Sequence, residues 1–518
     1  MRVTQPLKRN LQQIPEEIAT VCGDRSHTWS QLVHRISALA GGLVNLGLKP
    51  QERVAIVSLN SDLYLETIFA APWAGGVIVP INYRWSAPEI AFALNDSGTK
   101  IIFVDETFSS VVPDLKKLVE HELTVVSLDD AFEGCDEIYE DLISKSPELS
   151  EFENNENDIS GIFYTGGTTG RSKGVMLTHG NHISNTLQFT AMMETSPEMI
   201  FLHAAPTFHI ADALFIYLVT HIGGKHVFIP RFDPLLSAQA IQDQKITDVI
   251  LVPTMIQMLL EMENFENYNF DSLQRMYYGA SPMPEAVAKD LIDKLPQSKA
   301  YHLYGQTESA PLLTCLDSKY HVTDGPFAGR LRSAGRAMPA VELKIVDAKG
   351  NECPRGEIGE IIARGPNIMK GYWGQEELTK NTVKNGWLHT GDAARMDEGG
   401  FIFISDRLKD MIISGGENVY SAEVENAMYQ FSEVSQCAVI GVPDDKWGER
   451  VHAIVVLEEN SNASEQDLIT HCRSLIADFK CPRSVTFREE PLPLSGAGKV
   501  LKTELRKPFW EGKSKQVN

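Results

Sequence analysis

YTGGTTGRSKG, residues 164–174, is the stretch around which the chain is organised. It contains four glycines, three threonines and one lysine, between the apolar segments SGIFY (160–164) and VMLT (175–178). Glycine lets backbone N–H groups approach an anion because no Cβ stands in the way, while the threonine hydroxyls and Lys173 add further donors. The pattern predicts a loop between two strands that binds a polyphosphate, with a plain surface turn as the alternative.

This loop is not a Walker A loop, which requires the pattern G-x-x-x-x-G-K-[ST]. Counted from Gly167, the second glycine of that pattern falls on Ser172. The segment GAGK (496–499) also fails, because Pro493 occupies the first glycine position and Val500 follows the lysine. A polyphosphate bound by this loop would therefore be held in a different way from one bound by a Walker A loop.

Size and composition limit the classes of protein that fit. With 518 residues the chain predicts two or more domains, and the net charge of −22 disfavours nucleic acid as a partner. The seven cysteines form no C-x-x-C pair, which favours reduced thiols over a disulfide framework or a zinc site. No signal peptide is recognisable, and the longest apolar run, residues 68–81, is too short for a membrane span. A cytoplasmic location is expected.

Apolar periodicity alternates between helix and strand over most of the chain. Residues 28–48 read as a helix with Thr28 or Ser30 as its N-cap, residues 53–59 as a strand, and residues 63–73 as the next helix. The acidic residues 147–158 are expected to form an exposed connection into the glycine-rich loop. This alternation predicts an α/β fold with mainly parallel, layered sheets.

The sequence pattern changes near residue 341, where short strands separated by Gly and Pro turns predict a β-rich subdomain. A charged segment at 405–411 is expected to separate two domains. We place a large N-terminal domain at residues 1–408 and a small α+β domain at residues 409–518.

Five polar clusters lie downstream of the glycine-rich loop. Taken singly, each has an ordinary structural interpretation: an aromatic residue in the core, an Asp that bonds its own turn, or a solvated lysine. They are YGQTE (304–308), HTGD (389–392), Arg407 with Lys409, GGEN (415–418) and Lys499.

Together these motifs resemble the adenylate-forming superfamily, which includes acyl- and aryl-CoA synthetases, peptide-synthetase adenylation domains and firefly-type luciferases. The resemblance spans roughly residues 10 to 510 and rests on motifs in the family's order. They are YTGGTTGRSKG, YGQTE, GEIGEI, HTGD, DRLKDMIISGGENV and SGAGK. Gly166 departs from the pattern, because many members have Ser there.

The resemblance implies two half-reactions. A carboxylic acid attacks the α-phosphate of Mg-ATP to give an acyl-adenylate and pyrophosphate, and a thiol, usually that of coenzyme A, then displaces AMP. The catalytic residues it implies are Lys499, Thr307, Glu308 and His209, with Glu308 helping to bind Mg²⁺. Lys499 is expected to bridge the substrate carboxylate and the α-phosphate as charge develops.

By the same resemblance, Tyr304 is expected to stack on adenine, Asp392 to accept bonds from the ribose hydroxyls with Arg407 nearby, and Thr307 to contact the α-phosphate. The remaining ATP-binding residues are Thr165, Gly166, Gly167, Thr168, Thr169, Gly170 and Lys173 at the β- and γ-phosphates, and Gly279, Ala280, Ser281, Gly305 and Gln306. Lys409 matches the family's hinge, about which a mobile C-terminal domain rotates. The expected CoA-binding residues are Lys409, Gly415, Gly416, Glu417 and Trp447.

Thr207, Phe208 and His209 match the segment in which CoA synthetases carry an aromatic–His pair at the acyl pocket. Amino-acid-activating relatives have Asp at the position of His209, so an amino-acid substrate is disfavoured. Asp212 is interpreted as a helix cap. The expected pocket residues are Phe208, His209, Val252, Thr254, Gly279 and Met338, and their apolar character suits a fatty or aryl acid.

The sequence does not decide whether the acid is an aliphatic chain or an aromatic ring. It also leaves open whether the protein forms a homodimer. A free-standing enzyme that loads a carrier protein is the alternative to a CoA ligase, and a luciferase-like oxygenase would share the motifs. A non-catalytic binding protein is disfavoured because Lys499 and Glu308 are both present.

Overall fold

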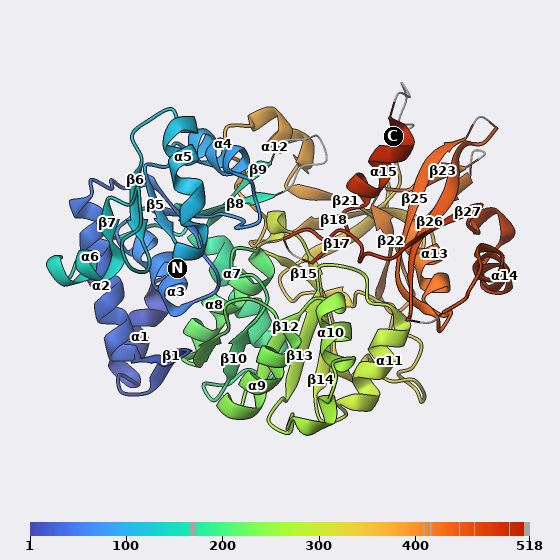
Figure 1. Ribbon diagram of the computed structural model, residues 1–518, viewed down its shortest axis with the longest axis horizontal. Helices are drawn as coiled ribbons and strands as arrows, with labels where there is room; N and C mark the ends of the chain where they lie inside the picture. The colour runs from blue at the N-terminus through green and yellow to red at the C-terminus, as the bar shows by residue number, and fades with distance from the viewer. Residues whose placement is uncertain are drawn as a thin grey trace.

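The computed structural model describes residues 1–165, 172–407, 410–414, 417–444, 446–459, 461–496 and 498–511. The predictions for Gly166, Gly167, Thr168, Thr169, Gly170, Lys409, Gly415 and Gly416 lie outside the described residues. Within the described ranges the strands form four sheets (Figure 1).

The first sheet has eight strands and ends beside the glycine-rich loop. Its central strands run parallel and are buried along their length, as near-continuous apolar runs predict. β8 pairs with β9 antiparallel, and Thr165 lies opposite Lys173, so the loop connects two paired strands. The order is β19 (Gly371–Tyr372), β9 (Lys173–Thr178), β8 (Ile159–Thr165), β4 (Val77–Pro80), β3 (Arg53–Val57), β5 (Ile101–Val104), β6 (Thr124–Ser127) and β7 (Glu137–Ile138).

The second sheet has nine strands and is parallel through its centre. β13 and β14 are neighbours, so the loops that follow Gly279 and Gly305 lie at the same edge of the sheet, where open α/β sheets bind ligands. The order is β16 (Arg336–Ala337), β15 (Leu312–Leu316), β14 (Lys299–Gly305), β13 (Arg275–Gly279), β12 (Asp248–Leu251), β10 (Ile200–His203), β11 (Lys225–Phe228), β1 (Ile18–Cys22) and β2 (Arg25–Thr28).

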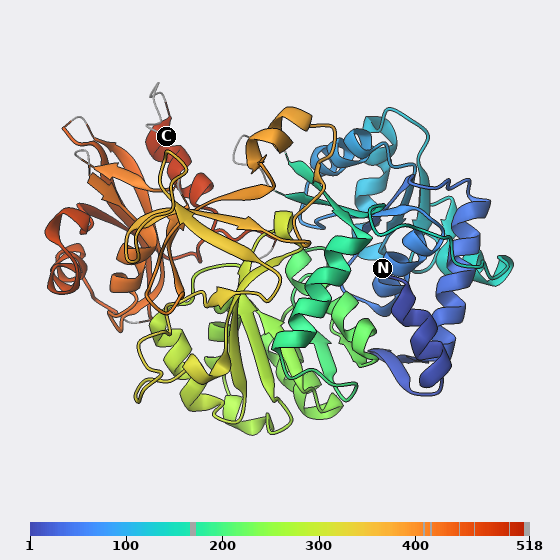
Figure 2. The ribbon, with the colours of Figure 1, turned by 180° about the vertical axis from the view of Figure 1, so that it is seen from behind.

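Two smaller sheets follow, and both ribbon views place them beside each other (Figures 1 and 2). The third is antiparallel and confirms the predicted β-rich subdomain. It contains β17 (Glu342–Val346), β18 (Ile358–Arg364), β20 (Val383–Lys384), β21 (Trp387–Met396) and β22 (Ile402–Arg407). The fourth contains β23 (Ile412–Ser414), β24 (Glu417–Val419), β25 (Val434–Asp444), β26 (Gly448–Leu457) and β27 (Ser484–Arg488).

Helices cover the sheets, and the α/β class is confirmed. The helix predicted at 28–48 is α2, and Thr28 rather than Ser30 is its N-cap, in a capping box with Gln31. The helices are α1 (Gln5–Gln13), α2 (Trp29–Asn45), α3 (Asp62–Trp73), α4 (Ala87–Ser97), α5 (Val112–Leu118), α6 (Tyr139–Lys145), α7 (His179–Met192), α8 (Ile210–Ile222), α9 (Pro234–Gln244), α10 (Pro253–Leu260), α11 (Glu285–Lys294), α12 (Glu376–Thr382), α13 (Ser421–Met428), α14 (Glu465–Leu475) and α15 (Lys502–Trp510). In the part of the chain that the structure describes, no helix combines the length and hydropathy that a bilayer crossing needs.

The prediction of an exposed connection at 147–158 is wrong in part. The Glu151 side chain is only 1% exposed and forms ion pairs with Arg2 and Lys8. Asn154 is also buried and donates to the Pro72 carbonyl oxygen at 2.7 Å. The acidic residues therefore anchor the N-terminal segment, because a buried carboxylate needs cationic partners.

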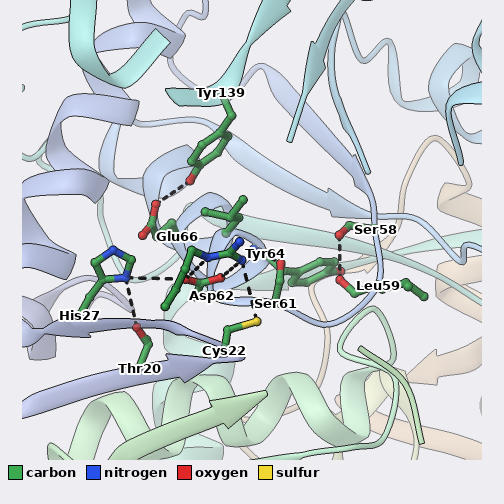
Figure 3. Close-up of polar contacts among 12 residues, drawn as sticks. Thr20, Cys22, His27, Ser58, Leu59, Ser61, Asp62, Tyr64, Glu66 and Tyr139 are labelled. Atoms are coloured by element: carbon green, nitrogen blue, oxygen red, sulfur yellow. Dashed lines mark hydrogen bonds and ion pairs between the residues drawn. The ribbon is translucent and has the colours of Figure 1, made fainter. Parts of the chain in front are cut away.

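A buried polar cluster lies between β1, β2, α3 and α6 (Figure 3). Asp62 is fully buried and accepts from Arg25 at 2.6 Å. One turn further along α3, Glu66 accepts from the Tyr139 hydroxyl at 2.8 Å. Burial raises the pKa of Glu66 to about 7 against the opposing effect of Arg35. These pairs connect α3 to β2 and to α6.

Several buried histidines are expected to make stability depend on pH. Burial lowers the pKa of His182 to about 3, and the same cause lowers the pKa of His203 to about 3. The unfolded chain binds a proton below about pH 6.5 and the folded one does not, so this stability is complete above pH 6.5 and is lost as the pH falls towards 3. Each such group should reduce the free energy of unfolding by about 2 kcal/mol at pH 5.

His182→Phe tests this expectation, because phenylalanine carries no titrating group into the same aromatic surroundings. Urea unfolding at pH 7.5 and pH 5.0 should show that the variant loses about 2 kcal/mol less than the unaltered protein on acidification. An equal loss in both proteins would mean that folded His182 gains the proton.

Candidate functional site

The predicted adenine and ribose residues meet where β14 approaches β21. The Tyr304 hydroxyl donates to Asp392 Oδ2 at 2.8 Å, and Arg407 Nε lies 3.2 Å from Asp392 Oδ1. Tyr304 and Asp392 are buried, and burial together with the Asp392 charge raises the pKa of Tyr304 well above its ordinary value. Asp392 and Arg407 are direct partners across β21 and β22. Residues from three strands thus hold one carboxylate in a fixed orientation.

The loops that follow β13 and β14 lie next to this group of residues. A Cβ on Gly279 would lie 2.0 Å from the Leu303 carbonyl oxygen, and one on Gly305 would lie 1.8 Å from that of Pro311. Only glycine fits where backbones approach this closely. Ala280 adopts a φ of +68°, so the chain turns sharply after β13. β13 and β14 pair in register as far as Gly279 and Leu303, so Ala280 and Ser281 follow one strand, while Gly305, Gln306 and Thr307 end or follow its neighbour.

Glu308 lies in a short 3-10 turn after β14, and a contact that the sequence analysis missed holds its side chain. The Tyr372 hydroxyl donates to Glu308 Oε1 at 2.8 Å. The Tyr372 ring also faces Lys173, whose Nζ lies 5.5 Å from the ring centroid. The predicted metal ligand and the lysine at the end of the phosphate loop therefore share one neighbour.

Lys499 is carried by a turn whose described residues are Ser495, Gly496, Gly498 and Lys499, called the lysine turn below. The Lys499 amide donates to Ser495 Oγ at 3.1 Å, which closes the turn. Arg84 Nη1 donates to the Ser495 carbonyl oxygen at 3.0 Å, and Thr254 Oγ1 approaches that of Gly498 at 3.4 Å. The turn is thus docked on the N-terminal part of the chain.

The predicted acyl residues lie against this turn. A Cβ on Gly496 would approach Phe208 Cζ to 2.9 Å, and one on Gly498 would approach Val252 Cγ2 to 2.8 Å. His209 caps α8, and its Nδ1 accepts from the Ala211 amide at 3.3 Å. Burial and the Lys499 charge lower the pKa of His209 to about 3, so the imidazole is neutral at physiological pH. Phe208, His209 and Val252 are therefore brought together with Lys499.

Asp212 was interpreted as a helix cap, and this is wrong because His209 caps α8. The Asp212 carboxylate is fully buried and lies 2.5 Å from His203 Nδ1. Burial raises the pKa of Asp212 well above its ordinary value. Asp212 connects the first turn of α8 to strand β10.

Met338 belongs to a core that includes one of the nucleotide residues, whereas Glu417 and Trp447 lie apart from them. Met338 is buried within the apolar core that contains Tyr304 and Leu312. Glu417 and Trp447 are exposed in the C-terminal sheet, where Ser414 pairs with both Glu417 and the neighbour of Trp447, Gly448. No contact in the described residues connects Glu417 or Trp447 to the nucleotide residues.

Sequence reasoning missed Tyr372 and Arg84. The segment GYW (371–373) lies in the region predicted as a β-rich subdomain, but β19 pairs with β9 in the first sheet; the Gly–aromatic pair was the available sequence signal. Arg84 follows β4 and had no recognisable motif. Among the residues that the structure describes, no three His, Cys, Asp or Glu side chains gather into a metal site.

The AMP-binding enzyme family matches residues 7–373, and the C-terminal domain of AMP-binding enzymes matches residues 423–499. The chain belongs to the AMP-binding enzyme family. The predicted resemblance to adenylate-forming enzymes is therefore confirmed. It follows that the motifs quoted above can be compared with those of characterised members.

Named relatives cover almost the whole chain. A feruloyl-CoA synthase from an Amycolatopsis species is 37% identical over 97% of this chain and 98% of its own length. A fatty acid–[acyl-carrier-protein] ligase, ScoC, from Streptomyces coeruleorubidus is 33% identical over 100% and 98%. An o-succinylbenzoate coenzyme A synthetase from Bacillus subtilis, solved with ATP and magnesium ion, is 28% identical with a TM-score of 0.84, covering 96% of this chain and 98% of that one.

Proposed function

We propose that this chain is an AMP-forming acid–CoA ligase that activates a fatty or aryl carboxylic acid with ATP and transfers the acyl group to coenzyme A. The observation that supports the proposal is the docked lysine turn, whose Gly496 and Gly498 lie against Phe208 and Val252, and whose Lys499 charge lowers the pKa of His209. A lysine held there can stabilise the approach of a carboxylate to a triphosphate, whose barrier is largely charge repulsion and positioning.

The other predicted site residues are assigned separate roles according to where they lie. The Tyr304–Asp392–Arg407 group offers a fixed carboxylate for the ribose hydroxyls, beside the loops after β13 and β14. Glu308 fits Mg²⁺, because this hard cation takes one or two carboxylates together with phosphate oxygens. When bound, Mg²⁺ would neutralise charge on the phosphates. Lys173 ends the phosphate loop and adds a positive charge.

A largely apolar acid suits the surroundings of the lysine turn. Phe208 and Val252 are buried, and Phe208 packs edge-on against Tyr83 at 5.1 Å. His209 is neutral and supplies no ammonium-binding carboxylate, which again disfavours an amino acid. The relatives named as feruloyl-CoA synthase and fatty acid ligase support both an aryl and a fatty acid. ScoC also keeps a carrier-protein thiol as the second candidate acceptor.

Rotation of a C-terminal domain about a hinge at Lys409 is part of the proposal. In the docked state, Lys499 serves adenylation, and rotation would then present the segment around Gly415, Gly416 and Glu417 to CoA. The boundary between residues 408 and 409 remains a prediction, because both residues lie outside the described ranges. The CoA-binding roles, a homodimer and a cytoplasmic location also remain predictions.

Product analysis tests the proposed reaction. The purified protein is incubated with Mg-ATP, CoA and a panel of fatty, cinnamic, benzoic and amino acids, and the products are identified by mass spectrometry. Formation of AMP, pyrophosphate and an acyl-CoA from an apolar acid is expected. Acyl-adenylate that accumulates with CoA, but is consumed by a phosphopantetheinyl carrier protein, would favour the second acceptor.

His209→Ala is expected to change the choice of acid and to slow thioester formation, while the apparent affinity for ATP stays within about twofold. The reason is that His209 lies against the lysine turn on the acyl side. A change of about tenfold in relative kcat/KM between two acids corresponds to about 1.4 kcal/mol, which one pocket contact supplies. Steady-state kinetics with two acids measure it.

His209→Asn is the matched control, because asparagine can still cap α8. It should keep the thermal stability of the protein while changing acid selectivity as alanine does. An altered affinity for ATP with unchanged selectivity in both variants would contradict the acyl-side assignment.

A further inference from the structure

Residues 369–373, called the bridging segment, connect Glu308 to the strand that follows the phosphate loop. The Met369 amide donates to the Glu308 carbonyl oxygen at 2.9 Å, which fixes the backbone of the predicted metal ligand. Trp373 donates to the carbonyl oxygen of Gly174 at 2.8 Å, directly after Lys173. Between these points, Gly371 and Tyr372 form β19 and pair with β9. The segment therefore touches both halves of the predicted phosphate and metal site.

The Tyr372 side chain also connects the two halves of the site, through its hydroxyl group and its ring. It is only 6% exposed, so neither part moves freely. The hydroxyl donates to Glu308 Oε1 at 2.8 Å, and the ring faces Lys173 Nζ at 5.5 Å from its centroid. A hydrogen bond orients a carboxylate that would otherwise rotate, and a ring face attracts an ammonium group. One buried side chain thus touches both charged groups.

We propose that Tyr372 is a positioning residue that aims Glu308 at the metal ion and Lys173 at the phosphates of ATP. The inference rests on the proposed function for the roles of Glu308 and Lys173. Its hydroxyl acts on the metal-dependent part of ATP binding, and its ring acts on the metal-independent part. AMP, which lacks the outer phosphates, should be indifferent to both.

The two parts can be removed separately. Tyr372→Phe removes the hydroxyl and keeps the ring, whereas Tyr372→Leu removes both. Isothermal titration calorimetry measures the binding of AMP and of α,β-methylene-ATP, a non-hydrolysable analogue, the latter once with EDTA and once with Mg²⁺. Loss of a hydrogen bond that orients a metal ligand typically lowers metal affinity by about 10- to 100-fold, and we expect an effect at the lower end of that range.

For Tyr372→Phe, we expect the Mg²⁺-dependent gain in affinity for the analogue to fall about tenfold, with binding in EDTA unchanged. For Tyr372→Leu, binding in EDTA should also weaken, by about threefold or more, because the cation–π contact with Lys173 is lost as well. The affinity for AMP should stay within about twofold in both variants, because AMP lacks the β- and γ-phosphates that Glu308 and Lys173 are proposed to serve.

Tyr139→Phe is the matched control. Tyr139 makes the same kind of contact, a buried hydroxyl that donates to a glutamate oxygen at 2.8 Å, but its partner is Glu66 in the N-terminal cluster (Figure 3). This variant should lose thermal stability comparable to that lost by Tyr372→Phe and should keep the full Mg²⁺-dependent gain.

Two results would overturn the inference: an unchanged Mg²⁺-dependent gain in Tyr372→Phe, or an equal loss of that gain in Tyr139→Phe. Failure of the proposed function looks different. If the unaltered protein binds the analogue with Mg²⁺ but forms no adenylate from any acid, the proposed reaction fails while the role of Tyr372 is still decided by binding. If it shows no Mg²⁺-dependent gain at all, both proposals are overturned.

Discussion

Replacement of Lys499 by alanine is expected to slow acyl-adenylate formation by about 10²–10³-fold and to leave the transfer of the acyl group from acyl-adenylate to CoA within about twofold. The lysine turn is docked against Phe208 and Val252, and the Lys499 charge already affects the neighbouring imidazole of His209. A cation held at this place stabilises the step in which two anions are brought together. The second half-reaction brings a neutral thiol or its thiolate to a mixed anhydride and does not need it.

The two half-reactions are measured separately. Acid plus Mg-ATP, followed by rapid quenching, gives the adenylation rate, and synthetic acyl-adenylate plus CoA gives the transfer rate. Lys507→Ala is the matched control, because Lys507 is an exposed lysine in the following helix, α15. Equal losses in both half-reactions for Lys499→Ala would refute the role assigned to the docked turn.

Replacement of Glu308 by alanine is the second large effect we expect. The rate of adenylation should fall by about 10²-fold or more, because a metal ion that neutralises phosphate charge contributes several kcal/mol to the transition state. Binding of AMP should stay within about twofold, since AMP needs no metal bridge between phosphates. The pair formed by Tyr304 and Asp392, which is proposed to bind the nucleoside, is not touched by the substitution.

Glu308→Gln separates charge from shape. Glutamine keeps an oxygen that can accept from the Tyr372 hydroxyl, so the local packing is retained while the charge is lost. Adenylation at increasing Mg²⁺ concentration and AMP binding by calorimetry provide the two measurements. If the glutamine variant matches the unaltered protein, the carboxylate charge is not used for the metal. If both variants lose AMP and Mg-ATP binding equally, Glu308 has a structural role instead.

Local signals carried much of the fold. The buried apolar run of β3 and the amphipathic pattern of α2 each follow from residues close together in sequence, because strand and helix periodicity are short-range properties. Thr28 could be predicted as a cap for the same reason, since its partner Gln31 is three residues away. Glu308 and Lys499 were predicted as site residues because each lies in a family motif, and the motifs follow one another in the family's order.

The features that were predicted wrongly depend on contacts between residues far apart in the sequence, which no local pattern encodes. Glu151 was expected to be exposed, but it pairs with Arg2 and Lys8 because the tertiary fold brings the N-terminus to it. Asp212 was expected to cap a helix, but strand β10 presents His203 to it. In each case the charge of the residue was evident and its partner was not.

Periodicity, residue types and the order of the motifs were enough to predict the α/β class, the family and the chemical nature of the site residues. Only the tertiary structure decided that Tyr372, 64 positions from Glu308, holds its carboxylate, and that Arg84, 411 positions from Ser495, contacts the lysine turn. The physical reason is that a hydrogen bond depends on the distance and direction between two atoms. Those are fixed by how sheets and domains pack, whereas periodicity and motifs record only the neighbours along the chain.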